Sequence, residues 1–284
     1  MLNISVNICT YNEEENIRAC LESVLINKPA EIIVVDGGST DRTEEICTEF
    51  GVKFVKSGKG LASQREEALR HSSQDYIALI DADDVISPNF LEQLITEMQE
   101  HRFDAIQGRE IAREPITYWE KAMGFVNHQI TFTATPEPTN MVGRPSVYRA
   151  EALKYVGFDP LFNGVGDEDT DLAIRFEAAG YRQGVGTGLA KRKQDETFKE
   201  IWKKFRKYGL GDARIFMKYP EKRINLLYHL SVRYPIIRGG KAILSKGGKY
   251  YPFFFMYGYV RLIYLVYGII ELRLKGIKVE RFKL

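Results

Sequence analysis

The chain has 284 residues, of which 44% are apolar and 27% are charged, and its net charge is +2. These ordinary globular values exclude disordered, collagen-like and low-complexity proteins. The length predicts one large domain, or one domain with an appendage.

Charge is distributed unevenly along the chain. Residues 1–181 carry 16 basic and 31 acidic side chains, whereas residues 182–284 carry 24 and 7. An acidic N-terminal part and a basic C-terminal part indicate two separate functions. The basic part could face nucleic acid or an anionic membrane surface, or it could pair electrostatically with the acidic part.

The three cysteines, Cys9, Cys20 and Cys47, have no paired spacing. Their pattern argues against a disulfide framework or a zinc-finger scaffold and favours a reducing compartment. The first residues lack a basic segment followed by a long apolar one, so we expect no signal peptide.

Residues 1–107 alternate short apolar runs with apolar side chains at helical spacing. Asp41 and Glu44 have the spacing of a capping box, and Ser87-Pro88 is typical of a cap followed by proline at the first helical position. This alternation predicts a mostly parallel sheet with helices on both faces, which binds ligands outside the carboxyl ends of its strands. The predicted strands are Asn3–Cys9, Glu31–Asp36, Val52–Val55, Tyr76–Ile80 and Asp104–Gln107, and the predicted helices are Glu13–Leu25, Asp41–Phe50, Leu61–Arg70 and one from Ser87 to Glu100.

The remainder of the chain is less regular at first and then strongly helical. Prolines punctuate a loop-rich stretch within residues 108–181, and Glu168–Ala179 returns to helical spacing. Beyond Gly188 we expect basic, aromatic helices. We therefore divide the chain into a catalytic domain, 1–210, and a helical region, 211–284. The helices predicted beyond Gly188 are Thr197–Tyr208, Asp212–Lys218, Ile224–Arg238 and Lys249–Leu274.

The DADD sequence at Asp81–Asp84 follows a predicted buried strand. Carboxylates packed at a strand end repel one another unless a positive group lies between them. A divalent cation bound by one or two carboxylates and by substrate phosphates meets that need. Asp81 and Asp83 therefore indicate a metal-bound phosphate ester, and an exposed acidic turn is the alternative.

Three further motifs are polar and follow predicted strands or precede predicted helices. In VDGGSTD, Asp36 could accept hydrogen bonds from a base or a ribose, and two glycines allow close approach of a ligand. TYNEE could bind or stack on a ligand, or could simply begin a helix. GDEDTDL could offer a general base for an acceptor hydroxyl, or could be an acidic helix start. These motifs span Val35–Asp41, Thr10–Glu14 and Gly166–Leu172.

Several familiar sites are not supported by the sequence. It contains no G-x-G-x-x-G after the first strand, no phosphate-binding G-x-x-x-x-G-K-[ST] and no G-x-S-x-G. The four histidines have no metal-ligand spacing, and no nucleic-acid recognition motif accompanies the basic region. We expect no nucleic-acid partner.

The order and spacing of the four motifs resemble family 2 of the glycosyltransferases, over residues 1 to about 210. The resemblance implies the GT-A fold, an α/β nucleotide-binding sandwich with a mostly parallel central sheet, here followed by C-terminal basic and aromatic helices. It implies transfer of a hexosyl or N-acetylhexosaminyl group from a nucleotide-sugar, with inversion at the anomeric carbon. By the same resemblance the donor is a UDP-sugar.

The resemblance also assigns roles by position. Asp36 resembles the residue that recognises the base, and Asp169 resembles the catalytic base, with Asp171 and Arg175 as support. Glu66 replaces the asparagine that commonly follows Arg65 in the family. Asp83 is the expected ligand of Mn²⁺ or Mg²⁺. The expected nucleotide-sugar contacts are Thr10, Tyr11, Asn12, Glu14, Asp36, Arg65, Asp81, Ala82 and Asp83.

One departure from the family concerns the metal. Many members have a histidine shortly before the segment that matches residues 197–211, and this chain has GLAKRKQDET there instead. We therefore expect that Lys191, Arg192 or Lys193 contacts the diphosphate and that the metal is held less tightly. Activity in the presence of a chelator tests this hypothesis.

Residues 250–272 are long and apolar enough to span a bilayer, but Arg261 interrupts them. With basic residues on both sides, we favour an interfacial helix on an anionic leaflet over a soluble core or oligomer helix, and both over a true span. A membrane surface suggests a lipid-linked or polysaccharide acceptor and a peripheral, cytoplasmic location at the inner face of the cell membrane. Trp119 and Glu168 are candidate acceptor contacts, although Trp119 and its aromatic neighbours could equally be helix core.

The sequence leaves two other functions open. A metal-dependent nucleotidyltransferase also uses paired aspartates, and it releases pyrophosphate rather than a nucleoside diphosphate. A non-catalytic glycan- or lipid-binding relative would be indifferent to Asp169→Asn.

Overall fold

The computed structural model describes residues 2–131, 133–246, 248–280 and 282. These residues form two compact units. The sheet unit comprises Met1–Ile116, Met123–Pro160 and Asp169–Gln194, and the helical unit comprises Thr117–Ala122, Leu161–Glu168 and Asp195–Leu284. The expected boundary at residue 210 lies inside helix α8, Phe198–Lys218.

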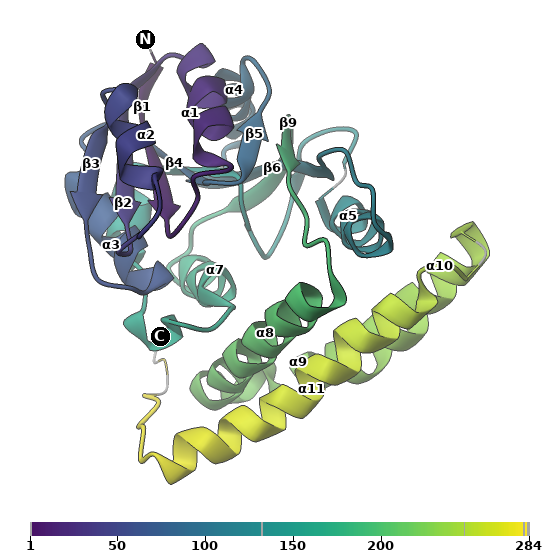
Figure 1. The fold of residues 1–284 in the computed structure, drawn as a ribbon. Coiled ribbons are helices and arrows are strands. Elements are labelled where there is room, and N and C mark those ends of the chain that lie inside the picture. Colours follow the sequence, from purple (N-terminus) through teal and green to yellow (C-terminus); the bar gives the residue numbers. More distant parts are fainter. Residues whose placement is uncertain (1, 132, 247, 281, 283–284) are drawn as a thin grey trace. The chain divides into compact units, whose positions relative to one another are not determined.

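The sheet unit is built on a nine-stranded mixed sheet (Figure 1). Its strand order is β3-β2-β1-β4-β8-β6-β9-β5, and β7 pairs with β9. The pairs among β1 to β4 and the pair β6–β9 are parallel, whereas β8, β5 and β7 run antiparallel to their neighbours. The predicted α/β class with its parallel sheet core is therefore confirmed. The strands are β1 Leu2–Thr10, β2 Pro29–Asp36, β3 Lys53–Lys56, β4 Tyr76–Asp81, β5 Asp84–Ile86, β6 Ala105–Ala112, β7 Glu137–Pro138, β8 Ser146–Arg149 and β9 Gln183–Arg192.

Alternating side chains direct the helices to the two faces of this sheet. Successive residues of a strand point to opposite faces, so Ala78 and Ile80 of β4 join one hydrophobic cluster, while Ile77 and Leu79 join another. The first cluster includes residues of α1, α2 and α4, and the second includes residues of α3, α6 and α7. These helices are α1 Ile17–Ile26, α2 Thr43–Glu49, α4 Phe90–His101, α3 Leu61–His71, α6 Ala150–Val156 and α7 Glu168–Ala178.

Three predicted helix starts are wrong in detail. Helix α1 begins at Ile17 rather than Glu13, after a turn in which the Asn16 N–H bonds to the Glu13 carbonyl. Helix α2 has no capping box at Asp41, because the Asp41 carboxylate instead accepts from the backbone N–H and the hydroxyl of Thr43. Helix α4 begins at Phe90 rather than Pro88, since Asn89 adopts φ +64 and the Phe90 N–H bonds to the Ser87 carbonyl. Before α2 and before α4, the polar residues that resemble helix caps belong instead to a tight turn.

The stretch expected to be loop-rich contains more regular structure than predicted. It holds β7, β8, α6, helix α5 (Tyr118–Thr131) and the 3₁₀-helix η1 (Pro160–Phe162). Strand β9 was not predicted because its glycines remove the apolar alternation. A Cβ on Gly184 would lie 2.4 Å from the Phe103 ring, so close packing of that ring requires glycine there.

The helical unit begins with one long helix where two were expected. Thr197 and Glu200 form a capping box at the start of α8, which continues to Lys218. Gly209 does not break it, because this glycine makes room for the backbone of residue Arg261. The elements that follow are η2 Pro220–Lys222, α9 Arg223–Tyr228, the π-helix η3 His229–Arg238, α10 Gly239–Lys246 and α11 Tyr251–Leu274. Within the described residues, α11 is the one helix with the length and apolar composition to cross a membrane.

Candidate active site

Three of the sequence motifs meet at the carboxyl edge of the parallel strands. Thr10 of β1 pairs with Asp36 of β2, and Cys9 pairs with Asp81 of β4. The buried Gln64 amide donates to the carbonyls of Thr10, at 2.9 Å, and Val35, at 3.0 Å, and so ties β1 to β2. The sequence predicted that these motifs lie at the carboxyl ends of the strands, and the strand register confirms it. Ligands of such sheets bind outside this edge.

Asp36 organises the turn that carries its motif. Its buried carboxylate accepts hydrogen bonds from the N–H groups of Gly38, at 2.9 Å, and Ser39, at 2.8 Å, and from the hydroxyls of Thr10 and Ser39. Gly38 has φ +88, a conformation that favours glycine. The turn therefore depends on Asp36.

The TYNEE loop is joined to the same turn. The Asn12 side-chain oxygen accepts from the Thr40 N–H at 2.8 Å, and the Glu14 carboxylate accepts from the Arg42 N–H at 3.1 Å. Tyr11 is 43% exposed, and the Lys59 ammonium lies 4.0 Å from its ring centroid. Two of the expected nucleotide contacts thus shape the loop, and Tyr11 presents a ring on which a base can stack.

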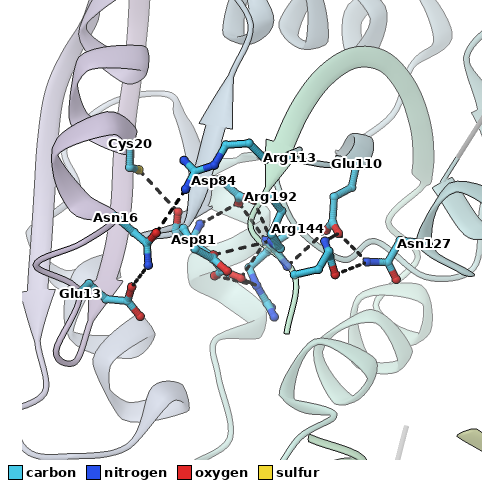
Figure 2. Close-up of polar contacts among 12 residues, drawn as sticks. Glu13, Asn16, Cys20, Asp81, Asp84, Glu110, Arg113, Asn127, Arg144 and Arg192 are labelled. Carbon is cyan, nitrogen blue, oxygen red and sulfur yellow. Dashed lines mark hydrogen bonds and ion pairs between the residues drawn. The ribbon is translucent and has the colours of Figure 1, made fainter. Parts of the chain in front are cut away.

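Asp81 is surrounded by three arginines from three different elements. Its carboxylate lies 3.3 Å from Arg65 Nη2, 3.0 Å from Arg144 Nε and 3.0 Å from Arg192 Nη2 (Figure 2). Arg144, Arg192 and Arg65 together hold the pKa of Asp81 well below its usual range, against the opposing effect of burial. Asp81 is therefore ionised at neutral pH and fixed in position.

Arg192 is the second centre of this network. The register pairs Arg192 of β9 with the fully buried Asp84 of β5, and two hydrogen bonds of 2.8 and 2.9 Å join them. Arg192 Nη1 lies 3.3 Å from the buried Glu110, which also accepts from Asn127 and Gln194 (Figure 2). Burial raises the pKa of Asp84 to about 7, although Arg192 opposes the shift. Arg192, one of the three candidate diphosphate contacts, is thus already paired with carboxylates of the protein.

The other two candidates lie elsewhere on or beyond β9. Lys191 is exposed, and Lys193 Nζ lies 3.6 Å from Glu15.

The acidic cluster suits one divalent cation. One oxygen each of Asp81, Asp83 and Asp84 lie within 4.8 Å of one another. Asp81 and Asp84 are hydrogen-bonded to arginines, whereas the Asp83 side chain is 32% exposed and lies 3.7 Å from Arg192 Nε. Oxygen donors of this kind suit a hard divalent cation, and the Arg192 guanidinium already contacts all three carboxylates.

Asp169 lies in the first turn of α7 and within reach of the same network. Its Oδ1 accepts from the Thr170 N–H at 2.8 Å, and its Oδ2 lies 3.7 Å from Arg144 Nη1. Arg144 therefore connects Asp81 with Asp169. Arg144 lies in a loop before β8 and belongs to no sequence motif, so no local signal in the sequence points to it.

The neighbours of Asp169 anchor α7 to the sheet unit. Asp171 is fully buried and binds Arg175 at 2.8 Å, and Arg175 donates to the carbonyls of Val156 and Gly157. Glu66, at the position of the family's asparagine, accepts from the Phe158 N–H at 2.9 Å. These contacts hold the connection between α6 and α7 in place. Glu66 therefore has a structural contact at the position where the family has a nucleotide-binding asparagine.

The two candidate acceptor residues belong to the helical unit. The Trp119 ring lies 5.4 Å from Phe198 and 6.4 Å from Phe253, centroid to centroid. Trp119 therefore packs in an aromatic cluster, as the helix-core alternative allowed. Glu168 is buried.

Comparisons with known proteins agree with this geometry. The family model described as "Glycosyl transferase family 2" matches residues 5–157. The "Glycosyltransferase GlyA" of Streptococcus pneumoniae is 34% identical over 113 residues, which are 37% of this chain and 16% of that protein. The "UDP-Glc:alpha-D-GlcNAc-diphosphoundecaprenol beta-1,3-glucosyltransferase WfgD" of Escherichia coli is 31% identical over 134 residues, or 40% of this chain and 53% of that protein.

Solved structures show the same fold. The crystal structure of S. aureus TarS 1–349 superposes with a TM-score of 0.55 at 17% identity, covering 97% of this chain and 92% of that one. The same TarS fragment has been solved in complex with UDP-GlcNAc, and that structure superposes with a TM-score of 0.53. At this identity the likeness shows the fold alone. The GT-A type fold expected from the sequence is confirmed.

Proposed function

Because the chain belongs to glycosyl transferase family 2, we propose that it transfers a sugar from a nucleoside diphosphate donor to an acceptor hydroxyl, with inversion at the anomeric carbon. One observation carries the proposal: Arg144 contacts both Asp81, in the donor motif, and Asp169, the candidate base. The Arg144 guanidinium thus holds the carboxylate that would bind the nucleotide-sugar close to the candidate general base. This arrangement suits a direct displacement between two substrates that are bound side by side.

We assign donor binding to the edge formed by β1, β2 and β4. Tyr11 offers a stacking surface for the base, Asp36 holds the neighbouring turn in place through four hydrogen bonds, and Asp81 offers acceptor oxygens for the ribose. Arg65, Arg144 and Arg192 fix Asp81 in place, so little conformational entropy is lost when the donor binds. Ala82 lies between the two aspartates and is itself buried.

The chemical step needs one proton acceptor. Asp169 takes the proton of the acceptor hydroxyl while the hydroxyl oxygen forms a bond to the anomeric carbon. The bond from that carbon to the diphosphate oxygen breaks on the opposite face, and its electron pair leaves with the nucleoside diphosphate. Attack opposite the leaving group inverts the anomeric centre.

Mn²⁺ or Mg²⁺ at Asp83 would stabilise the negative charge that grows on the leaving diphosphate. Asp83 is the most exposed of the three carboxylates, and its contact with Arg192, at 3.7 Å, is longer than the contacts of Asp81 and Asp84 with the same guanidinium. We infer that the protein alone binds the ion weakly and that the bound diphosphate completes its coordination. Lys191 and Lys193 remain candidates for additional diphosphate contacts.

We propose a UDP-sugar as donor and a lipid-linked or polysaccharide hydroxyl as acceptor. The name of the E. coli relative WfgD specifies UDP-glucose and a diphosphoundecaprenol-linked sugar, and TarS has been crystallised with UDP-GlcNAc. We propose that the reaction takes place at the cytoplasmic face of the cell membrane, with the protein attached peripherally.

The first experiment measures nucleotide release from UDP-, GDP- and dTDP-sugars with Mn²⁺, Mg²⁺ or chelator. We expect UDP release from a UDP-sugar and a loss of about 10²–10⁴-fold in Asp169→Asn, because general base catalysis contributes that much. UDP binding should survive in this variant. Asp75→Asn, a carboxylate before the opposite end of β4, is the matched control and should retain the wild-type rate.

Three results would overturn the proposal. Release of pyrophosphate would indicate a nucleotidyltransferase. Equal rates in Asp169→Asn and wild type would remove Asp169 from the reaction. Absence of both turnover and nucleotide binding would indicate a non-catalytic relative.

A further inference from the structure

Helix α11 is fixed along one side to the rest of the helical unit. A Cβ on Gly268 would lie 2.7 Å from the Ala213 Cβ, and one on Gly258 would lie 2.4 Å from the Leu230 carbonyl oxygen. Glycines at both points allow backbones to approach closely. This side of α11 is therefore packed against α8 and η3.

The centre of α11 is held by a buried ion pair. Arg261 donates two hydrogen bonds of 2.8 Å to Asp212 of α8 and one of 3.0 Å to the Tyr257 hydroxyl. Asp212 and Tyr257 raise the pKa of Arg261 well above its ordinary value despite its burial. The charge that interrupts the apolar segment is thus neutralised within the helical unit.

The opposite side of α11 is exposed and apolar. Its exposed residues follow the three- and four-residue spacing of one helix face, and Ile263 is 62% exposed. No charged residue lies on this face between Phe255 and Ile270. At 1.5 Å per residue the face is about 28 Å long. We call it the apolar stripe, and it consists of Phe255, Ile263, Val266, Tyr267, Ile270 and Leu274.

Basic side chains lie at both ends of the apolar stripe. Lys249 is exposed before its first turn, and Arg273, Lys275 and Lys278 are exposed at or beyond its last turn. Lys275 also contacts Glu271 at 2.7 Å. The stripe thus combines an apolar surface with positively charged ends.

We propose that the apolar stripe lies in the plane of an anionic lipid bilayer, at the level of the headgroups. An apolar helix face with basic flanks gains free energy both from burial among acyl chains and from attraction to acidic lipids. This attachment depends on the helical unit alone and is independent of the transfer reaction.

A transmembrane orientation of α11 is incompatible with its packing. Asp212 and the glycine contacts hold α8 along α11, and α8 carries the exposed Lys203, Arg206 and Lys207. Spanning would bring those charges into hydrocarbon, or would break the Arg261–Asp212 pair and leave two charges unpaired there.

A second copy of the chain is a poor occupant of the same face. If two stripes paired, parallel or antiparallel, each basic end would meet a basic end of the other copy. Such like-charge contacts oppose association. An anionic surface is complementary to both ends at once.

Sedimentation with lipid vesicles tests the proposal. We expect the wild-type chain to bind vesicles containing 30 mol% phosphatidylglycerol (~0.1 M salt) more tightly than phosphatidylcholine vesicles. Ile263→Ser combined with Ile270→Ser should weaken binding at least tenfold, because both side chains leave the acyl region. Arg273→Gln combined with Lys278→Gln should weaken it on the order of tenfold.

Matched controls lie on the sheet unit. Ile26→Ser removes an exposed isoleucine from α1, and Lys28→Gln with Lys53→Gln removes two exposed charges. These variants should bind as the wild type does. Circular dichroism and the thermal midpoint establish that each variant is folded.

Three outcomes would overturn the proposal. They are no wild-type binding to anionic vesicles, unchanged binding of the Ile263/Ile270 variant, and a dimer in light scattering that this variant dissociates without any vesicle binding. The dimer would mean that a second copy occupies the stripe.

Discussion

The three aspartates of DADD illustrate how environment separates identical side chains. Asp81 is fixed by three guanidinium groups, Asp84 is buried against Arg192, and Asp83 is the most exposed of the three aspartates. A row of equal carboxylates in the sequence therefore becomes an anchored acceptor, a structural ion-pair partner and a metal-ligand candidate. Burial and counter-charges, which come from distant positions, create the difference.

Arg144 provides a residue-level prediction. Arg144→Gln removes a guanidinium from Asp81 and from Asp169 at once, so we expect a donor KM about tenfold higher and a kcat at least tenfold lower in nucleotide-release kinetics, as charge-assisted hydrogen bonds are lost. Arg149→Gln is the control, because Arg149 lies on the adjoining strand and contacts Asp104 at 3.3 Å. A variant at Arg144 with wild-type KM and kcat would show that the network is only structural.

At the scale of elements, several glycines lie inside regular strands and helices, although glycine commonly interrupts such elements. The glycines of β9 leave room for Phe103 and Phe90, and those of α8 and α11 leave room for facing backbone or side chains. In the sequence both sets resemble breaks in regular structure. Only the partner that approaches each glycine shows that it belongs inside a strand or a helix.

Gly209 of α8 allows a direct test. In Gly209→Ala the new Cβ would lie 2.5 Å from the Arg261 carbonyl oxygen, and we expect the helical unit to lose about 1–3 kcal/mol in its free energy of unfolding. Gly240→Ala in α10 meets no atom within 4 Å, and removing backbone freedom there should be neutral or stabilising. Urea denaturation of both variants measures the two effects. Equal stability of the two would contradict tight packing at Gly209.

At the scale of the whole molecule, the charge asymmetry corresponds to two compact units with different chemistry. The sheet unit holds three of the acidic motifs and the part of GDEDTDL from Asp169 onward, and the helical unit holds α11 with its basic ends. The helical unit also includes Thr117–Ala122 and Leu161–Glu168, which come from the middle of the chain. A division at one sequence position therefore does not describe it.

This organisation predicts that catalysis and attachment separate by mutation. Asp169→Asn should lose nucleotide release and keep vesicle binding, whereas Ile263→Ser with Ile270→Ser should lose vesicle binding and keep the release rate measured without a membrane. Each variant is assayed for both properties at the same protein concentration. Loss of both properties from either variant would contradict the separation.

The sequence by itself determined the α/β class, the family and the motif positions. Strand β1 is predictable from its apolar alternation, and β2 and β4 are predictable from continuous apolar runs that end in aspartate, because these patterns are local signals. Asp36, Asp81, Asp83 and Asp169 stand out for the same reason, as each belongs to a short motif after a strand or before a helix.

Only the tertiary structure decided how these residues are joined. Arg144, Arg192 and Glu110 belong to no motif and reach the acidic cluster through strand register and loop placement. Likewise, the sequence shows Arg261 as an unpaired charge in an apolar segment, whereas the structure shows that Asp212 pairs with it. Interactions between residues far apart in the chain leave no periodicity in the sequence, so burial and pairing become visible only when the chain is folded.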